Sequence, residues 1–450
     1  MSVSLVETPV PTPSAAPVPT TAGSPVNEEP PATGLRPAAF GNATGLSCRE
    51  CGHRTDLGPF YACAECFGPL EVAYDFPAIT RADIESGPAN IWRYQALLPV
   101  PADIQDSPNM EPGFTRLLRA QNLGRELGLA RLWVKDDSTN PTHSFKDRVV
   151  ACALSAAREL GAKVFACPST GNLANAVAAA GARAGIKTVV FIPADLEQAK
   201  QVNSAVYTEQ LVAVKGTYDD VNRLASEIAG EEEGWAFVNV NVRPFYAEGS
   251  KTLGYEIAEQ LGWRLPDQVV IPVASGSQLT KVDKAFQELI ALGLVEAKPY
   301  RIFGAQATGC SPVSAAFKAG HQVVRPVKPD TIAKSLAIGN PADGPYVLDV
   351  CRRTGGTVED VSDEEVREGI ILLARTEGIF TETAGGTTVA VLRKLVETGQ
   401  LDPEAETIVI NTGMGLKTLD AVSGHVGPAA TIDPSYAAFV ATGLSGEEPA

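Results

Sequence analysis

Residues Asn140–Arg148 read Asn-Pro-Thr-His-Ser-Phe-Lys-Asp-Arg, and the rest of the chain is interpreted from this stretch. A strand-like run, Arg131–Lys135, precedes it, and an apolar-periodic run, Phe145–Leu160, follows it. Ser144 with an acidic residue three positions later is typical of a helix N-terminus, so we expect Lys146 in the first turn of a helix. There the unpaired backbone N–H groups and the helix dipole disfavour an ammonium. The lysine is therefore a candidate nucleophile towards an aldehyde; the alternative is an exposed lysine at an ordinary helix start.

The stretch resembles the Asn-Pro-Thr-Gly-Ser-Phe-Lys-Asp-Arg motif of the threonine synthases, which belong to the fold-type II pyridoxal-phosphate enzymes. In that family the motif lysine carries the cofactor as a Schiff base, and the resemblance implies this role for Lys146. His143 stands where the family has glycine, so a side chain must accept a backbone conformation that glycine adopts freely. We expect this departure to change the loop and to leave the lysine in place.

Composition limits the classes of function. The chain has 450 residues, 44% of them hydrophobic and 20% charged, which is ordinary for a globular protein. Its net charge of −16 argues against a nucleic-acid partner held by phosphate contacts. No apolar run reaches the length of about 18 residues that a membrane-spanning helix needs. The Pro-, Ala-, Thr- and Ser-rich start lacks the basic region of a signal peptide, so we expect a disordered tail and a cytoplasmic protein.

Two cysteine pairs follow the tail, Cys48 with Cys51 and Cys63 with Cys66. Two such C-x2-C turns can present four thiolates tetrahedrally to one zinc ion; the alternative is four reduced thiols in a degenerate ribbon. A similar segment precedes the catalytic region in some threonine synthases, so its position fits the resemblance and a structural role. We expect a tail (1–40), a zinc-ribbon-like segment (41–75), a catalytic region of two α/β subdomains (76–423) and a C-terminal tail (424–450).

From about Arg93 onward, β-branched runs alternate with helical patterns, which is typical of an α/β protein with a largely parallel sheet. The resemblance implies two doubly wound α/β domains with the cofactor between them. Ligands in such sheets gather beyond the carboxyl ends of the strands. We expect strands at Val164–Cys167, Thr188–Ile192, Leu211–Val214, Val269–Val273, Ile302–Ala305 and Thr407–Ile410, and helices at Leu173–Ala184 and Gly249–Leu261.

The loop Ser169–Asn172 follows the first of these strands and resembles the Ser-Thr-Gly-Asn of the same family. Backbone N–H groups at a helix start, with the hydroxyls of Ser169 and Thr170, suit a carboxylate; the alternative is a polar helix cap. The resemblance implies that the loop holds the substrate carboxylate and that Asn172 hydrogen-bonds the cofactor's ring oxygen. Leu173 stands where many relatives have threonine, which removes a hydroxyl that could help to hold a substrate phosphate.

A second group of polar side chains lies in the approach to Glu248-Gly249-Ser250-Lys251-Thr252. Arg243 offers bidentate geometry for a phosphate, and Lys251 offers a point charge. Relatives show a similar Asn-rich, Arg-containing approach, so we expect Asn241, Arg243 and Lys251 to meet the substrate phosphate. The alternative is that both charges are solvated at the surface.

The loop after Val269–Val273 has small residues that let backbone N–H groups approach a phosphate dianion, with a helix dipole behind them. The resemblance implies that it holds the cofactor's 5′-phosphate, through Ala274, Ser275, Gly276, Ser277 and Gln278.

Two further segments lie nearer the C-terminus. Thr412–Lys417 resembles the Thr-Gly-x-Gly-Leu-Lys segment of the family, and Thr412 takes the place that faces the pyridine nitrogen. Where relatives often continue Pro-Ala-Ser, this chain has Thr383-Ala384-Gly385-Gly386. We expect the glycines to open space near the cofactor ring or the substrate.

These motifs follow the family's order from Cys48 to Lys417. The resemblance implies a threonine synthase: a pyridoxal-phosphate-dependent carbon–oxygen lyase that converts O-phospho-L-homoserine and water to L-threonine and phosphate, as a homodimer. Alternatives with the same fold are a cysteate-synthase-like enzyme and a serine/threonine dehydratase. From a different class, a zinc-ribbon binding protein with an inactive catalytic region is the alternative, and the intact Lys146, Asn172 and Thr412 argue against it.

Overall fold

The computed structural model describes residues 39–60, 62–169, 171–194, 198–216 and 218–444. Nearly all of the predicted tail at 1–40 therefore lies outside the described residues, as does the predicted site residue Thr170. Within these ranges, no helix is both long enough and apolar enough to cross a membrane.

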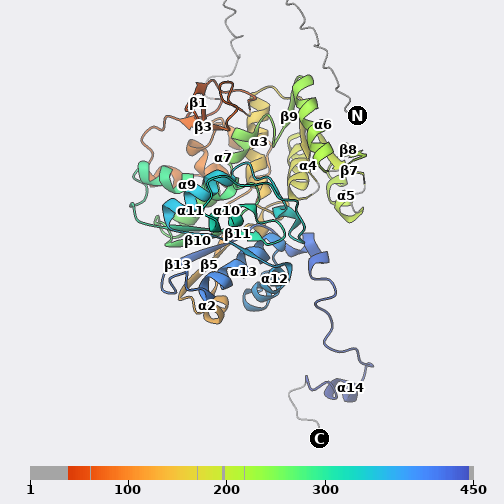
Figure 1. The fold of residues 1–450 in the computed structure, drawn as a ribbon. Helices are drawn as coiled ribbons and strands as arrows, with labels where there is room; N and C mark the ends of the chain where they lie inside the picture. Colours follow the sequence, from red (N-terminus) through yellow and green to blue (C-terminus); the bar gives the residue numbers. More distant parts are fainter. Residues whose placement is uncertain (1–38, 61, 170, 195–197, 217, 445–450) are drawn as a thin grey trace, which may run out of the picture. The chain divides into compact units, whose positions relative to one another are not determined.

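The cysteine segment forms a small antiparallel sheet of its own, drawn in red and brown in Figure 1. Its strand order is β2-β1-β3, with β1 at Ala43–Cys48, β2 at Arg54–Thr55 and β3 at Leu70–Tyr74. Cys48 ends the central strand, and the tight turn after it carries Cys51. The sheet thus holds one cysteine pair at the end of a hydrogen-bonded strand.

A parallel four-stranded sheet forms one α/β unit, in the order β8-β7-β6-β9. Helices α4 (Asn172–Ala184) and α6 (Tyr218–Glu231) pack against it, and α5 (Gln198–Ala205) contacts α4. Its strands are Val164–Pro168 (β6), Lys187–Pro193 (β7), Leu211–Val214 (β8) and Trp235–Phe237 (β9).

A six-stranded sheet forms the second α/β unit, in the order β12-β11-β10-β13-β5-β4. All neighbours are parallel except β4, which pairs antiparallel with β5. The strands are Arg116–Arg119 (β4), Arg131–Asp136 (β5), Gln268–Pro272 (β10), Arg301–Ala307 (β11), Val358–Val361 (β12) and Glu406–Asn411 (β13).

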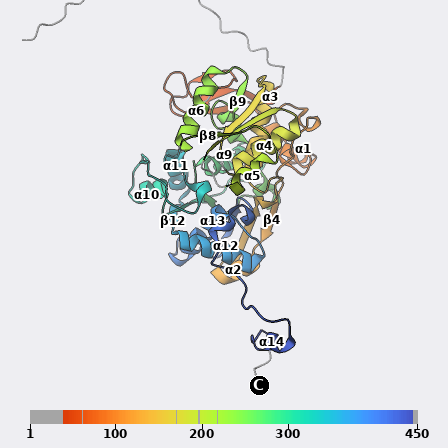
Figure 2. The ribbon, with the colours of Figure 1, turned by 90° about the vertical axis from the view of Figure 1, so that its right-hand side faces the viewer.

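Helices cover both faces of the six-stranded sheet, as Figures 1 and 2 show. One face carries α9 (Ser277–Ala291), α10 (Pro312–Lys318) and α11 (Gly344–Thr354). The other carries α2 (Gln121–Leu127), α12 (Asp363–Glu377) and α13 (Thr383–Glu397). The remaining helices and 3-10 turns are α1 (Arg81–Glu85), η1 (Ile91–Leu97), η2 (Ile104–Asp106), η3 (Asp137–Thr139), α3 (Lys146–Glu159), α7 (Arg243–Glu248), α8 (Lys251–Gln260), η4 (Lys334–Leu336), η5 (Gly415–Ala421) and α14 (Tyr436–Val440).

The α/β interpretation is confirmed: each predicted strand overlaps an observed one, with ends shifted by a residue or so. The predicted helices are present as α3, α4 and α8. In the two α/β sheets as described, three further strands, β4, β9 and β12, were not predicted. They are short, and two of them carry several polar residues, so their hydrophobic pattern is weak.

The expectation that Gly385 and Gly386 open space is wrong. A Cβ at Gly385 would lie 1.8 Å from the Thr381 Oγ1 atom, and one at Gly386 would lie 2.5 Å from Ile370 Cγ1. Gly386 instead lets α13 pack closely against α12, and Gly385 lets it approach Thr381 and Asn411, because the volume that a side chain would occupy is already filled at both positions.

Candidate functional site

Lys146 is the first residue of α3, as predicted, but the helix is capped differently. Its N-cap is Phe145, which has no side-chain cap, so the capping role predicted for Ser144 is wrong. The carboxylate of Asp147 turns back into the preceding loop, where it accepts hydrogen bonds from the Thr142 amide at 2.7 Å and the Thr142 hydroxyl at 2.6 Å. Asp147 therefore closes the loop that leads to the lysine.

Arg148 anchors the start of α3 in the protein interior. Its guanidinium is fully buried and bonds Asp137 at 2.8 Å and Glu256 of α8 at 2.8 Å. Lys135 on β5 bonds the same Glu256 at 2.7 Å. Burial opposes ionisation of Glu256, but the two cations outweigh it and lower its pKa to about 2. This ion cluster fixes α3 relative to β5 and α8, and with it the position of Lys146.

The amine of Lys146 lies in a partly buried position and contacts a residue that the sequence analysis did not select. The Tyr246 hydroxyl, on α7, is 3.1 Å from the Lys146 Nζ atom. The two rings nearest the amine are those of Phe145 and Tyr246, with centroids at 5.5 and 5.8 Å. A lone tyrosine in a helical pattern carries no signal that would distinguish it from a packing residue.

The loop that carries Lys146 is bound to the loop after β13. The Phe145 amide donates to the Thr412 carbonyl at 2.8 Å, and the Met414 amide donates to the His143 carbonyl at 3.1 Å. His143 has φ +62°, the left-handed conformation that the family's glycine would adopt freely. The histidine thus accepts the glycine-like geometry, and the structure brings Thr412 beside the lysine loop.

Glu382, just before α13, joins two of the predicted cofactor ligands. Its buried carboxylate accepts from the Thr412 hydroxyl at 2.7 Å and from the Asn172 amide at 2.7 Å. The Asn172 carbonyl oxygen in turn accepts from Lys417 at 3.0 Å. Burial lowers the pKa of Lys417, although Glu382 and Asp147 act in the opposite direction. Glu382 directly precedes the Thr383–Gly386 stretch, and no role was predicted for it from the sequence.

The loop from Ala274 to Gln278 connects β10 to α9. Gly276 has φ +100°, and a Cβ there would lie 2.7 Å from the Val347 side chain, so both conformation and space require glycine. Ser277 and Gln278 form the first turn of α9, where backbone N–H groups have no intrahelical acceptor. A phosphate can bind to free backbone N–H groups of this kind at the N-terminus of a helix.

Two buried polar atoms in the predicted site have no hydrogen-bond partner within the described part of the chain. They are the Ser144 hydroxyl, two residues before Lys146, and the Gln278 amide nitrogen. Buried polar atoms are rarely left without partners, and a polar, phosphate-bearing ligand would supply them. The residues present therefore fit a pyridoxal-phosphate cofactor.

The three residues predicted to bind the substrate phosphate differ in their burial and in their hydrogen-bond partners. Arg243 begins α7 and donates to Asp343 at 2.9 Å, next to the Ser275–Gly276 turn. Asn241 uses its amide to bind the backbone of β9, at Phe237 N and Trp235 O, both at 2.8 Å. Lys251 is fully buried among acceptors, with Glu248 at 2.7 Å and Leu97 O at 2.8 Å. Of these three residues, Arg243 alone has a partly exposed cation that could meet a phosphate.

The predicted carboxylate loop lies at the carboxyl end of β6. Ser169 is buried, and Asn172 is the first residue of α4. The N-cap of α4 is Gly171, and no side chain caps the helix, so the alternative of a polar side-chain cap is not what the described residues show.

The four cysteines of the small sheet are gathered at one point. The Sγ atoms of Cys48, Cys51, Cys63 and Cys66 all lie within 4.8 Å of one another. Four thiolates at such spacing can coordinate a single zinc ion.

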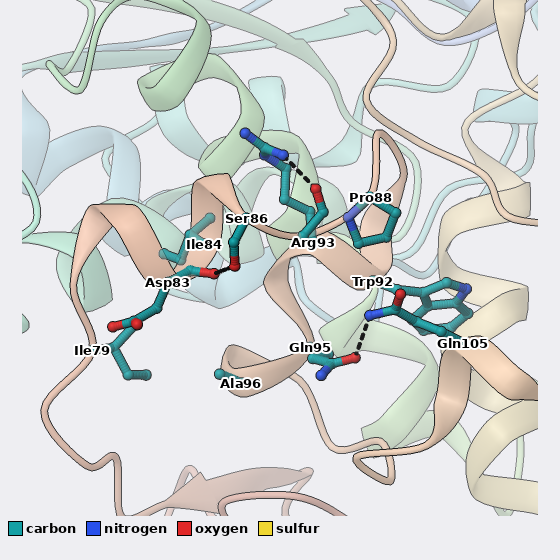
Figure 3. A pocket seen from close by; sticks show the side chains of 11 residues that line it. Ile79, Asp83, Ile84, Ser86, Pro88, Trp92, Arg93, Gln95, Ala96 and Gln105 are labelled. Atoms are coloured by element: carbon teal, nitrogen blue, oxygen red, sulfur yellow. Dashed lines mark hydrogen bonds between the residues drawn. The ribbon is translucent and has the colours of Figure 1, made fainter.

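Two cavities lie away from the Lys146 amine. One of about 590 Å³ is lined by residues between Ile79 and Gln105. In Figure 3 the Ser86 hydroxyl donates to the backbone carbonyl of Asp83, and the Gln105 side-chain amide donates to the Gln95 side-chain oxygen. The other, of about 580 Å³, lies behind the lysine loop and includes His143 and Met414. Neither contains Lys146 among its lining residues.

The chain resembles known proteins over most of its length. Residues 109–413 match the family described as pyridoxal-phosphate dependent enzyme. A threonine synthase from Methanocaldococcus jannaschii is 37% identical over 380 residues, covering 83% of this chain and 93% of that protein. One from Methanosarcina acetivorans is 36% identical over 381 residues, covering 83% and 92%. Among solved structures, the processed form of threonine deaminase isoform 2 from Solanum lycopersicum has a TM-score of 0.60 at 22% identity, covering 76% of this chain and 96% of that chain, which shows the shared fold.

Proposed function

This chain belongs to the pyridoxal-phosphate dependent enzyme family, and from that premise we propose that it is a threonine synthase, which converts O-phospho-L-homoserine and water to L-threonine and phosphate. The observation that carries the proposal is the convergence of a lysine loop with the proposed cofactor ligands. The Phe145 amide binds the Thr412 carbonyl directly, and Glu382 joins Thr412 to Asn172.

Each part of the site has a proposed task. The amine of Lys146 holds the cofactor's aldehyde carbon, the Ala274–Gln278 loop holds its 5′-phosphate, and Thr412 and Asn172 contact the ring nitrogen and ring oxygen. The bound cofactor supplies delocalisation of negative charge from the substrate's carbon atoms. The orphaned Gln278 amide and the glycine-dependent turn at Gly276 support this placement.

Substrate handling falls to the residues around the ring. Ser169 and Thr170 are proposed to hold the substrate carboxylate at the start of α4. Lys146, once free, removes and returns protons at Cα and Cβ, and the nearby Tyr246 hydroxyl, at 3.1 Å, can hold the amine in position between these transfers. Arg243 is proposed to hold the phosphate that leaves from Cγ.

The guanidinium of Arg243 favours a phosphorylated substrate over the runner-up, a serine/threonine dehydratase. Its side chain is 27% exposed and has Asp343 on one side, so part of the guanidinium faces outward. A dehydratase substrate carries no phosphate and would leave this cation unused.

We also propose that Cys48, Cys51, Cys63 and Cys66 hold a structural zinc ion, which the clustering of the four sulfur atoms supports. The homodimer and the cytoplasmic location remain predictions from the sequence.

The test is to measure phosphate release from O-phospho-L-homoserine and to identify threonine as the product. We expect turnover by the native protein and a loss of about 10³-fold or more in Lys146→Ala, because no other amine replaces a positioned nucleophile and base. Lys187→Ala, an exposed lysine at the start of β7, is the matched control and should keep full activity.

A yellow protein that makes no threonine would leave the cofactor assignment standing and refute the substrate. Sulfite and unphosphorylated serine or threonine would then be the substrates to assay. Unchanged activity in Lys146→Ala would refute the assignment of the lysine.

A further inference from the structure

The cysteine segment contributes no group to the proposed chemistry, yet the two residues inside its first C-x2-C turn reach the catalytic region. The guanidinium of Arg49 lies 3.5 Å from the centroid of the Tyr346 ring, on α11. The neighbouring Glu50 accepts a hydrogen bond from the Tyr346 hydroxyl. Both contacts start between Cys48 and Cys51, so the turn that would bind the metal is also the turn that binds α11.

Asp343, at the N-terminus of α11, is shared by two arginines. One carboxylate oxygen is 3.6 Å from Arg49, and the other is 2.9 Å from Arg243. The Asp343 amide donates to the Ser275 carbonyl at 2.8 Å, in the proposed cofactor-phosphate loop. The side chain of Asp343 is 8% exposed, so these contacts are only weakly screened by water.

A second connection runs from the same arginine to α9. Arg49 lies 3.4 Å from Glu71 on β3, and Glu71 bonds Lys281 on α9 at 2.7 Å. Burial opposes ionisation of Glu71, but Lys281, Lys284 and Arg49 lower its pKa to about 2, so this carboxylate is charged at neutral pH. The helix that begins at the proposed phosphate loop is thereby joined to the cysteine segment.

From these contacts we propose that Arg49 is a positioning residue that couples the cysteine segment to the affinity of the site for the substrate phosphate. The proposal rests on the function proposed above for Arg243. Because Arg49 takes up one oxygen of Asp343, that carboxylate holds Arg243 in place without fully neutralising it. Without Arg49, the Asp343 carboxylate would pair with Arg243 alone. More of the positive charge of Arg243 would then be neutralised, and its attraction for a phosphate dianion would be weaker.

The experiment compares Arg49→Met with Arg54→Met in the full-length protein loaded with zinc and cofactor. Both changes remove one positive charge from the same cysteine segment, but the Arg54 side chain is exposed and, among the described residues, donates only to Thr44, on the neighbouring strand. Zinc content, KM and kcat for O-phospho-L-homoserine, and the dissociation constant of inorganic phosphate by calorimetry are measured for each. The phosphate titration needs no turnover.

We expect KM and the phosphate dissociation constant to rise roughly three- to tenfold in Arg49→Met, with kcat within about twofold of the native value. Zinc content should remain native, and Arg54→Met should behave as the native protein. Arg49→Lys keeps the charge and should recover part of the phosphate affinity.

A zinc-loaded Arg49→Met whose phosphate affinity equals that of Arg54→Met would overturn the proposal. So would a fall in kcat without a rise in KM, because that is the signature of general structural damage. If Arg49→Met does not fold, Arg49→Gln replaces it against Arg49→Lys, and equal phosphate affinity of this pair overturns the proposal. A native protein that binds phosphate but forms no threonine refutes the proposed reaction, while weaker phosphate binding in Arg49→Met still supports the coupling.

Discussion

Glu382 is the residue on which the proposed ring contacts depend. A threonine hydroxyl and an asparagine amide can each rotate, and neither is oriented by its own backbone. The carboxylate of Glu382 accepts hydrogen bonds from both groups at 2.7 Å. The Lys417 ammonium can only donate, so the atom of the Asn172 amide that it contacts must be the oxygen. Gly413 leaves room for this carboxylate, since a Cβ there would lie 2.7 Å from the Glu382 Oε1 atom.

We therefore expect Glu382→Gln to bind pyridoxal phosphate about tenfold more weakly than the native protein. A charged hydrogen bond of about 1.5 kcal/mol is lost, and one of the two donors then faces an amide N–H. The measurement is a spectroscopic titration of the cofactor-free protein. Glu397→Gln, an exposed change at the other end of α13, is the control and should bind normally. Equal or tighter binding by Glu382→Gln would mean that the carboxylate competes with the cofactor for Thr412 and Asn172.

At the scale of elements, the short helix α7 links the lysine to the proposed phosphate region. Its first residue, Arg243, contacts Asp343, and Tyr246, one turn later, contacts Lys146. The helix can lie against α3 because Gly249 follows it. A Cβ at that position would lie 2.5 Å from the Arg148 carbonyl oxygen and 2.7 Å from the Val149 Cα atom, both in the backbone of α3.

Gly249→Ala should therefore force α7 away from α3. We expect a loss of about 1–3 kcal/mol in the free energy of unfolding, as for other overpacked sites, together with a fall in kcat as Tyr246 moves from Lys146. Denaturant titration and steady-state kinetics measure the two effects. In the control Gly230→Ala, on the exposed side of α6, a Cβ meets no atom within 4 Å, and stability should be unchanged or slightly higher. Identical behaviour of the two variants would show that α3 tolerates the extra methyl group.

Prediction from sequence succeeded where a repeating pattern or a contiguous motif carried the signal. The buried parallel strands and the position of Lys146 at a helix start were of this kind. The cap at Ser144 was wrong because Asp147 bonds Thr142 instead of closing a capping box. Glu382 and Tyr246 lie 236 and 100 positions from Lys146 (382 − 146 and 246 − 146). Their roles arise from tertiary contacts, which no local pattern specifies.

At the scale of the molecule, buried ion clusters join elements that are distant in sequence. Arg148, Asp137, Glu256 and Lys135 bring α3, η3, α8 and β5 together without any water-exposed side chain. A buried cluster of this kind is costly to assemble, and removing one of its two cations or two carboxylates leaves one buried charge without a counter-charge. The position of Lys146, the proposed catalytic lysine, is thus tied to the stability of the fold.

Glu256→Gln tests this link through its pH dependence. At neutral pH we expect a loss of about 3–5 kcal/mol in the free energy of unfolding, since Lys135 loses the carboxylate that it bonds and Arg148 loses one of the two carboxylates that it bonds. The folded pKa of Glu256, about 2, lies below its ordinary value of 4.5, so its stabilising contribution is complete above about pH 4.5 and is lost as the pH falls towards about 2. The stability gap between native protein and variant should therefore narrow by about 1.4 kcal/mol per pH unit below about pH 4.5.

Urea titrations across that range measure the gap between the native protein and Glu256→Gln. The control is Glu227→Gln, whose exposed pair with Arg223 is screened by water, and it should show neither the loss of stability nor the narrowing of the gap. A gap that stayed constant with pH would show that the loss comes from altered packing, because only an ionised carboxylate at Glu256 makes the difference depend on protons.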